Sequence, residues 1–101
     1  MMLQKPPPMR DIEIGRGAEI SDLQEEGEDY HFITLTENGY IIKCKLKKSL
    51  LGQDKPQNGK IESGYFKGRV EFEPKNNNFS TIEGLLEVEA WLDVRFAEEK
   101  G

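Results

Sequence analysis

The stretch YHFITLTENGYIIKCKLKK, residues 30–48, decides the fold of this chain. Two segments of alternating apolar and polar residues flank the pair Asn38-Gly39. An Asn-Gly pair favours a two-residue type I′ turn, because both central residues of that turn need a positive φ. The stretch therefore predicts a β-hairpin. The pairs on its core face are expected to be Leu35 with Ile42, Ile33 with Cys44, and His31 with Leu46.

The other face of the predicted hairpin carries lysines beside a phenylalanine. Successive side chains of a strand point to opposite faces, so this register turns the intervening residues outward. A slip of one residue would bury the lysines, and we expect this penalty to fix the register. The outward set of the hairpin is then Phe32, Thr34, Thr36, Ile41, Lys43, Lys45 and Lys47.

Three more segments show the two-residue period of β-strands. They are residues 11–14, residues 65–73, which Pro74 ends, and residues 86–96. In residues 65–73 the pattern predicts an outward row of Tyr65, Lys67, Arg69 and Glu71. In residues 86–96 it predicts a core row of Leu86, Val88, Ala90, Leu92, Val94 and Phe96, and an outward row of Glu87, Glu89, Trp91, Asp93 and Arg95.

The remaining segments set the domain organisation. Residues 21–29 are acidic and indicate either one turn of helix or a solvated loop, and residues 50–63 indicate a long polar connection. A chain of 101 residues has the length of one domain. Short strands joined by polar turns predict an all-β fold, a small five-stranded barrel of the oligonucleotide-binding (OB) type, with an SH3-like barrel or a small sandwich as alternatives. The predicted parts are a flexible Pro-rich tail at 1–10, a β-barrel domain at 11–97 and a C-terminal tail at 98–101.

Charge is distributed unevenly along this acidic chain, which has a net charge of −5. Residues 1–39 hold three basic and nine acidic side chains, residues 40–70 eight and two, and residues 71–101 three and eight. The middle third is therefore a basic segment between acidic flanks. Either the flanks neutralise it in the fold, or it forms a surface for an anionic partner.

Composition points to a reduced, cytoplasmic protein. No apolar stretch is long enough to span a membrane, and the first residues, MMLQKPPPMR, lack the apolar segment of a secretory signal. A single cysteine, Cys44, has no partner for an internal disulfide.

Catalytic and metal-binding patterns are absent from the sequence. The single histidine, His31, and Cys44 fall two pairs apart on the predicted core face, which favours structural roles over a nucleophile and its base. No Cys or His spacing matches a zinc site, and acids that alternate along a strand are typical of its solvated side. We therefore predict a non-enzymatic protein without cofactor or metal.

Two binding functions follow from the predicted faces. Cations neutralise phosphates and aromatic rings stack on bases, so a basic face with aromatics favours single-stranded DNA or RNA. The residues of this predicted nucleic-acid face are Phe32, Thr34, Lys43, Lys45, Lys47, Tyr65, Lys67 and Arg69. If the acidic strand at 86–96 lies beside the lysines, its carboxylates would instead cancel their charge.

The second function is a protein interface centred on an outward tryptophan. A large aromatic ring in a charged face is typical of an interaction hot spot, here Trp91 with Glu87, Glu89 and Asp93. Such a surface would serve an adaptor, an assembly subunit, an acidic inhibitor or a homodimer.

Overall fold

The structure, a computed structural model, describes residues 9–74 and 82–98 of the chain. These residues form six strands and one short 3₁₀ turn. The strands are β1 (Met9–Ile14), β2 (Glu19–Glu26), β3 (Asp29–Leu35), β4 (Ile41–Lys47), β5 (Gly59–Pro74) and β6 (Ile82–Phe96), and the 3₁₀ turn η1 is Lys48–Leu50.

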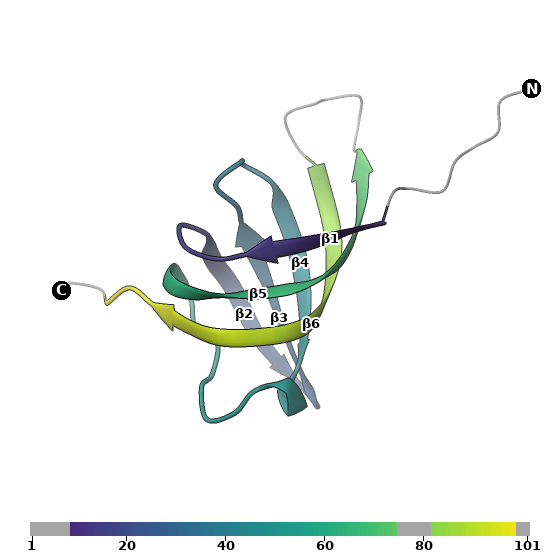
Figure 1. Cartoon of the computed structure of the whole chain (residues 1–101). Coiled ribbons are helices and arrows are strands. Elements are labelled where there is room, and N and C mark those ends of the chain that lie inside the picture. Colours follow the sequence, from purple (N-terminus) through teal and green to yellow (C-terminus); the bar gives the residue numbers. More distant parts are fainter. Residues whose placement is uncertain (1–8, 75–81, 99–101) are drawn as a thin grey trace, which may run out of the picture.

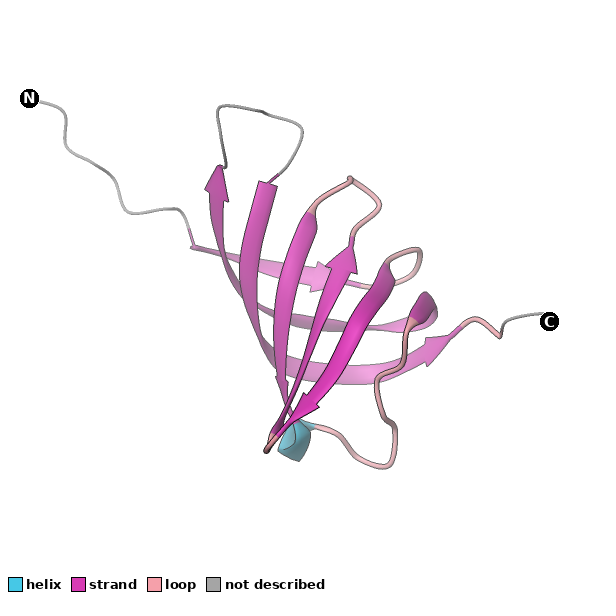
Figure 2. Ribbon diagram, turned by 180° about the vertical axis from the view of Figure 1, so that it is seen from behind, coloured by secondary structure: helices cyan, strands magenta, loops and turns pink. Residues whose placement is uncertain are grey.

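The strands close into a five-stranded barrel, as the sequence predicted. Strands β1 and β2 share one position in it, because both pair with β5, β1 along residues 66–71 and β2 at residues 59–60. The order around the barrel is β1/β2, β3, β4, β6, β5 and back to β1/β2. Only β4 and β6 run parallel among these described neighbours. In Figure 1, β1, β5 and β6 cross in front of the fainter β2, β3 and β4, and Figure 2 shows the barrel from behind.

The barrel interior is filled by aromatic and aliphatic side chains. Phe66 is fully buried, and its ring stacks on Trp91 with the centroids 5.2 Å apart. Phe32 meets Phe66 edge to face, with the centroids 5.7 Å apart. Fully burying one large apolar side chain contributes about 1.5–3 kcal/mol. The rest of the core is formed by Ile14, Ala18, Ile20, Tyr30, Ile42, Cys44, Leu46, Ile61, Val70, Leu86, Val88 and Val94.

The hairpin of β3 and β4 forms, but its predicted register is wrong by one residue. Phe32 pairs with Cys44, and Thr34 with Ile42, so these four side chains are buried in the core. The outward residues of β3 are instead His31, Ile33 and Leu35.

The reason is a loop of three residues rather than two. Thr36 pairs with Tyr40, donating its N–H to the Tyr40 carbonyl at 3.0 Å, and the Gly39 N–H donates to the Thr36 carbonyl at 2.9 Å. Gly39 has a φ of +85°, while Asn38 is not among the residues with positive φ, so a type I′ turn is excluded. A turn closed by a left-handed glycine is the usual three-residue hairpin loop. The extra loop residue moves every side chain of β3 to the opposite face.

Strand β6 departs from the predicted alternation between two bulges. Gly68 pairs with Val88 but Lys67 with Ala90, which leaves Glu89 as an extra residue. The second irregularity follows Leu92, where Asp93 has a φ of +49°. Between the two bulges, each side chain of β6 points to the face opposite to the one that the alternation predicted.

The exchange overturns the predicted positions of two side chains. Trp91 is only 9% exposed and lies in the core, whereas Leu92 is 38% exposed. Outside this short segment Leu86, Val88 and Val94 are buried as the pattern predicted.

The other segments differ from the prediction mainly in length. Residues 21–29 are not helical, because β2 extends to Glu26 and a short turn leads into β3. β5 begins at Gly59 and so takes up part of the predicted polar connection. Met9 and Arg10, assigned to the tail, belong to β1. Residues 1–8 of that tail, and 99–101 of the C-terminal tail, lie outside the described residues.

Candidate nucleic-acid interface

A row of three lysines lies along the outer face of β4. Lys43, Lys45 and Lys47 alternate with the buried residues of the strand, so they follow one another at about 6.6 Å. Lys45 lies 3.9 Å from an Asp29 carboxylate oxygen. Neither Lys43 nor Lys47 forms an ion pair within residues 9–74 and 82–98, and both are exposed. We call these three residues the lysine row.

The next lysine along the chain is already paired. Lys48, in η1, bonds to Glu25 of β2 and lies 5.3 Å from the centre of the Tyr30 ring. The Lys48 ammonium holds the pKa of the Glu25 carboxyl below its usual value, by hydrogen bonding and charge attraction. Lys48 therefore offers less free charge to a ligand than the lysine row does.

The predicted nucleic-acid face loses Phe32, one of its two aromatic rings. Phe32 is 2% exposed and Thr34 is fully buried, so neither belongs to an outer surface. An outward ring beside the lysine row is that of His31, which pairs with Lys45 across the strands. Its imidazole is 42% exposed and its Nε2 lies 3.6 Å from a Glu26 oxygen.

The basic residues of β5 are separated from the lysine row by β6. Lys67 and Arg69 do point outward and are exposed, and Tyr65 is half-buried. Glu87 of β6, however, is the register partner of both Lys45 and Arg69. Arg69 in turn approaches Asp11 of β1, with Nε 3.4 Å from a carboxylate oxygen.

Charges therefore alternate in sign across four neighbouring strands, from β4 to β1. This is the neutralising arrangement that the sequence left open. The predicted basic face is divided in two, into the lysine row on β4 and the residues Tyr65, Lys67 and Arg69 on β5.

The predicted protein interface loses its centre, since Trp91 is packed against Phe66 and Phe96 in and beside the core. Glu87 and Glu89 are exposed on β6 as predicted, and Asp93 is exposed at the second bulge. Without an accessible ring these acids resemble an ordinary solvated face.

The structure also places together a group of outward aliphatic side chains. Ile33 and Leu35 of β3 lie beside Lys43 and Ile41 of β4, and Leu85 of β6 is the register partner of Lys43. Leu35 is 44% and Leu85 56% exposed. We call Ile33, Leu35, Ile41 and Leu85 the aliphatic cluster. Ile33 and Leu35 could have been assigned to this outer face from the sequence if a three-residue hairpin loop had been assumed.

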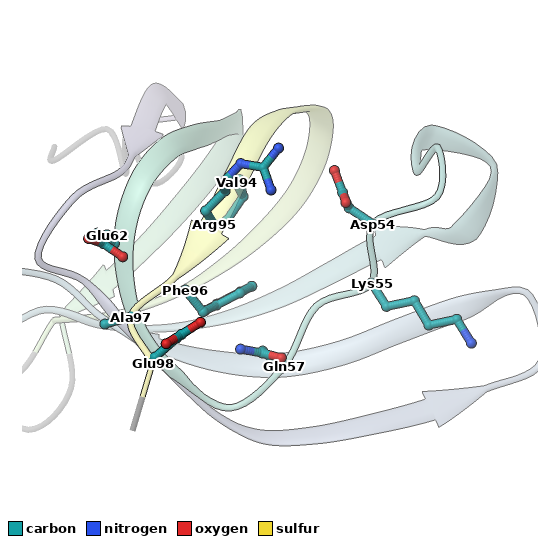
Figure 3. A pocket seen from close by; sticks show the side chains of 9 residues that line it. All are labelled: Asp54, Lys55, Gln57, Glu62, Val94, Arg95, Phe96, Ala97 and Glu98. Carbon is teal, nitrogen blue, oxygen red and sulfur yellow. The ribbon is translucent and has the colours of Figure 1, made fainter. Parts of the chain in front are cut away.

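A surface hollow with a volume of about 660 Å³ lies between the connection after η1 and the end of β6. Figure 3 shows the Phe96 ring pointing into it, Asp54 and Arg95 on either side, and Lys55 turned away. The Glu62 and Glu98 carboxylates complete a lining of mixed sign. This lining favours no single class of charged ligand.

Cys44 and His31 are not a catalytic pair in this fold. The predicted common face for the two residues is wrong, because Cys44 points into the barrel and His31 out of it. Burial raises the pKa of the Cys44 thiol. No group of three or more histidine, cysteine or acidic residues able to hold a metal ion occurs within the described ranges.

Cys44 is accordingly expected to resist thiol reagents in the folded protein. The thiolate is the reactive form, and burial both disfavours it and blocks access. We expect negligible reaction with Ellman's reagent under native conditions and one thiol per chain in denaturant. Rapid labelling of the folded protein would contradict the inward position of Cys44.

Comparison with known proteins gives no relative. No protein-family model matches the chain, and neither a curated protein nor a solved structure shows significant similarity to it. In the described part of the chain, no helix has the length and apolar character needed to cross a membrane.

Proposed function

We propose that this chain is a non-enzymatic binding module of the OB type that binds single-stranded nucleic acid on the outer face of β3 and β4. The observation that carries the proposal is the lysine row on that face. The strand order supports the OB assignment, because one bent strand, β1/β2, pairs at both ends of the order and β4 runs parallel to β6. In OB barrels, oligonucleotides bind on the second and third strands, the positions that β3 and β4 hold here.

Fold alone does not imply function, so the side chains of the face have to supply the binding chemistry. Lys43, Lys45 and Lys47 are spaced along an extended strand and can contact successive phosphates of an extended nucleic-acid chain. His31 supplies an exposed ring and Ile33 an apolar surface for bases. Such contacts read no particular sequence.

The size of the lysine row sets the expected salt dependence. Binding of single strands weakens with a slope of about −0.7 per neutralised phosphate in a plot of log K against log salt. Three phosphate contacts therefore give a slope of about −2. Glu87 beside Lys45 lowers the net attraction for phosphates. We therefore expect weak binding, with a dissociation constant in the micromolar range or larger.

Fluorescence anisotropy of a labelled oligonucleotide of about 12 nucleotides tests the proposal. Lys43→Glu and Lys47→Glu are each expected to weaken binding about tenfold, which corresponds to about 1.4 kcal/mol, and to make the salt slope shallower. Lys55→Glu is the matched control, because Lys55 is an exposed lysine on the connection before β5. Absence of binding at low salt, or an equal loss in the control, would refute the proposal.

A further inference from the structure

A small hollow on the outer face of the barrel adjoins the lysine row. Its volume is about 350 Å³, inside the range of about 300–1,000 Å³ that is typical of small-ligand sites. The outward side chains that line it are Asp22 and Gln24 of β2, His31 and Ile33 of β3, Lys43 of β4 and Leu85 of β6. A carboxylate, an amide, an imidazole ring and an ammonium group therefore meet within the surface that we propose for nucleic acid.

A bulge in β2 brings Asp22 to this hollow. Ser21 pairs with Ile33 and Gln24 with His31, so β2 has one residue more than β3 between these two pairs. Asp22, inside the bulge, has a φ of +53°, a conformation that aspartate adopts more readily than most residues other than glycine. Among residues 9–74 and 82–98, its carboxylate has neither a hydrogen bond nor an ion pair. The bulge thus presents an unpaired carboxylate on the outer face.

Charge across this face determines how a single strand would lie on it. The lysine row of β4 attracts phosphates, whereas Asp22 and Glu26, exposed on β2, repel them. Since β3 lies between β2 and β4, the two rows are two strand spacings apart, roughly 10 Å. A nucleotide has a similar length from its phosphate to the Watson–Crick edge of its base. A phosphate at Lys43 therefore lets the base cross β3 and meet Asp22 with that edge.

The chemistry of the carboxylate decides which base fits. A carboxylate accepts hydrogen bonds and donates none, so Asp22 favours a base edge that carries donors. Guanine alone among the bases has two adjacent donors on its Watson–Crick edge, N1–H and the N2 amino group, and both can donate to the two oxygens of Asp22. Its O6 acceptor, beside them, can receive a hydrogen bond from the Gln24 amide.

The other bases match the carboxylate less well. Adenine and cytosine each offer one amino group next to a ring nitrogen that only accepts hydrogen bonds. Thymine offers one N–H between two carbonyl oxygens, which a carboxylate repels. Each of them can therefore make at most one hydrogen bond to Asp22 where guanine makes two.

We infer that this hollow is a guanine-selective base subsite, with Asp22 as the residue that determines its specificity. The inference rests on the proposed function, because Lys43 holds the phosphate of the selected nucleotide. His31 and Ile33 lie under the base, as aromatic and apolar side chains do in the recognition of single strands. The remaining nucleotides are held by the lysine row without selection of their bases.

Fluorescence anisotropy with three oligonucleotides of equal length tests the inference. They are an oligothymidylate of about 12 nucleotides, the same strand with one central guanine, and the same strand with hypoxanthine in place of that guanine. We expect the guanine to tighten binding about tenfold, since a bidentate contact to a base gives discrimination of this order. Hypoxanthine lacks the N2 amino group and should lose most of the gain.

Asp22→Asn tests the role of the carboxylate. Asparagine tolerates a positive φ but has only one acceptor oxygen in its side chain, so the guanine and thymidine strands should bind the variant with equal affinity. Asp93→Asn is the matched control. Asp93 is also an exposed aspartate with a positive φ, +49°, at a bulge of β6, and it lies outside the hollow. This control should retain the full preference for guanine.

The outcomes separate the subsite from the proposed function. Equal affinity of the wild-type chain for the guanine and thymidine strands would overturn the subsite and leave the proposed function standing. A guanine preference that persists in Asp22→Asn would overturn it too, whereas absence of binding by all three strands at low salt would reject both proposals. Guanosine 5′-monophosphate has a single phosphate and should compete only at a far higher concentration than the guanine strand. Competition at equal concentration would assign the hollow to a free nucleotide and overturn the inference.

Discussion

Replacing Trp91 with alanine is expected to lower the free energy of unfolding by about 3–5 kcal/mol. The indole lies between Phe66 and Phe96, with ring centroids 5.2 and 6.4 Å away, and Phe32 meets it from the side at 6.4 Å. Truncation removes the central ring of this group and leaves a cavity that a barrel wall cannot collapse to fill. The loss is a large part of the 5–15 kcal/mol that stabilises a typical domain.

Urea denaturation followed by far-ultraviolet circular dichroism measures this loss, because the variant has no other tryptophan to report by fluorescence. The neighbouring Leu92→Ala is the matched control, and we expect it to change stability by less than about 1 kcal/mol. A reversed order, with Leu92→Ala the more damaging, would restore the simple alternation along β6 and refute the two bulges.

Gly64→Ala is expected to be at least as destabilising, by about 3 kcal/mol or more. Gly64 has a φ of +77°, a conformation that costs an alanine about 1–3 kcal/mol. A Cβ at this position would also collide with the backbone oxygen of Asp93, at the second bulge of β6. Since that obstacle is backbone, β5 and β6 would have to separate, which adds a similar cost.

Gly27→Ala separates the two contributions to this loss. Gly27 also has a positive φ, +57°, but nothing lies within 4 Å of the place its Cβ would take. The control should lose about 1–2 kcal/mol, the conformational cost alone. Equal losses in the two variants, measured by thermal or urea denaturation, would mean that β5 and β6 are not in close contact at Gly64.

The sequence predicted the hairpin and the barrel because both depend on patterns that are local. Alternation in residues 30–48 and 65–73 marks strands wherever they pair. The register of the hairpin depends on one further choice, between a two-residue and a three-residue loop at Gly39. Both loops use an Asn-Gly pair well, so the pair alone does not decide the register.

The bulges of β6 depend on its partner strand and left no such local signal. Glu89 becomes an extra residue only because Gly68 and Lys67 of β5 pair on either side of it. The two-residue period over 86–96 takes no account of the bulges. It therefore placed Leu86, Val88 and Val94, which lie outside the segment between the bulges, correctly, and it placed Trp91 on the wrong face.

The candidate site was predicted in part for the same reasons. Lys43, Lys45 and Lys47 face outward in the structure, because a shift confined to β3 does not alter which face β4 turns to the core. Phe32 and Thr34 were wrongly placed on the outer face, because the predicted hairpin loop was one residue too short. The separation of Arg69 from the lysine row reflects strand order, which is set by contacts between distant segments and not by any local pattern.

Titration of the isotope-labelled protein with single-stranded oligothymidylate, followed residue by residue by ¹⁵N–¹H NMR, tests the central claim most directly. The account predicts saturable, salt-sensitive shifts concentrated at β3 and β4 around the lysine row, with little change at Leu92 or in the connection holding Lys55. Shifts absent at low salt, or concentrated on β5 and β1, would contradict nucleic-acid binding on this face.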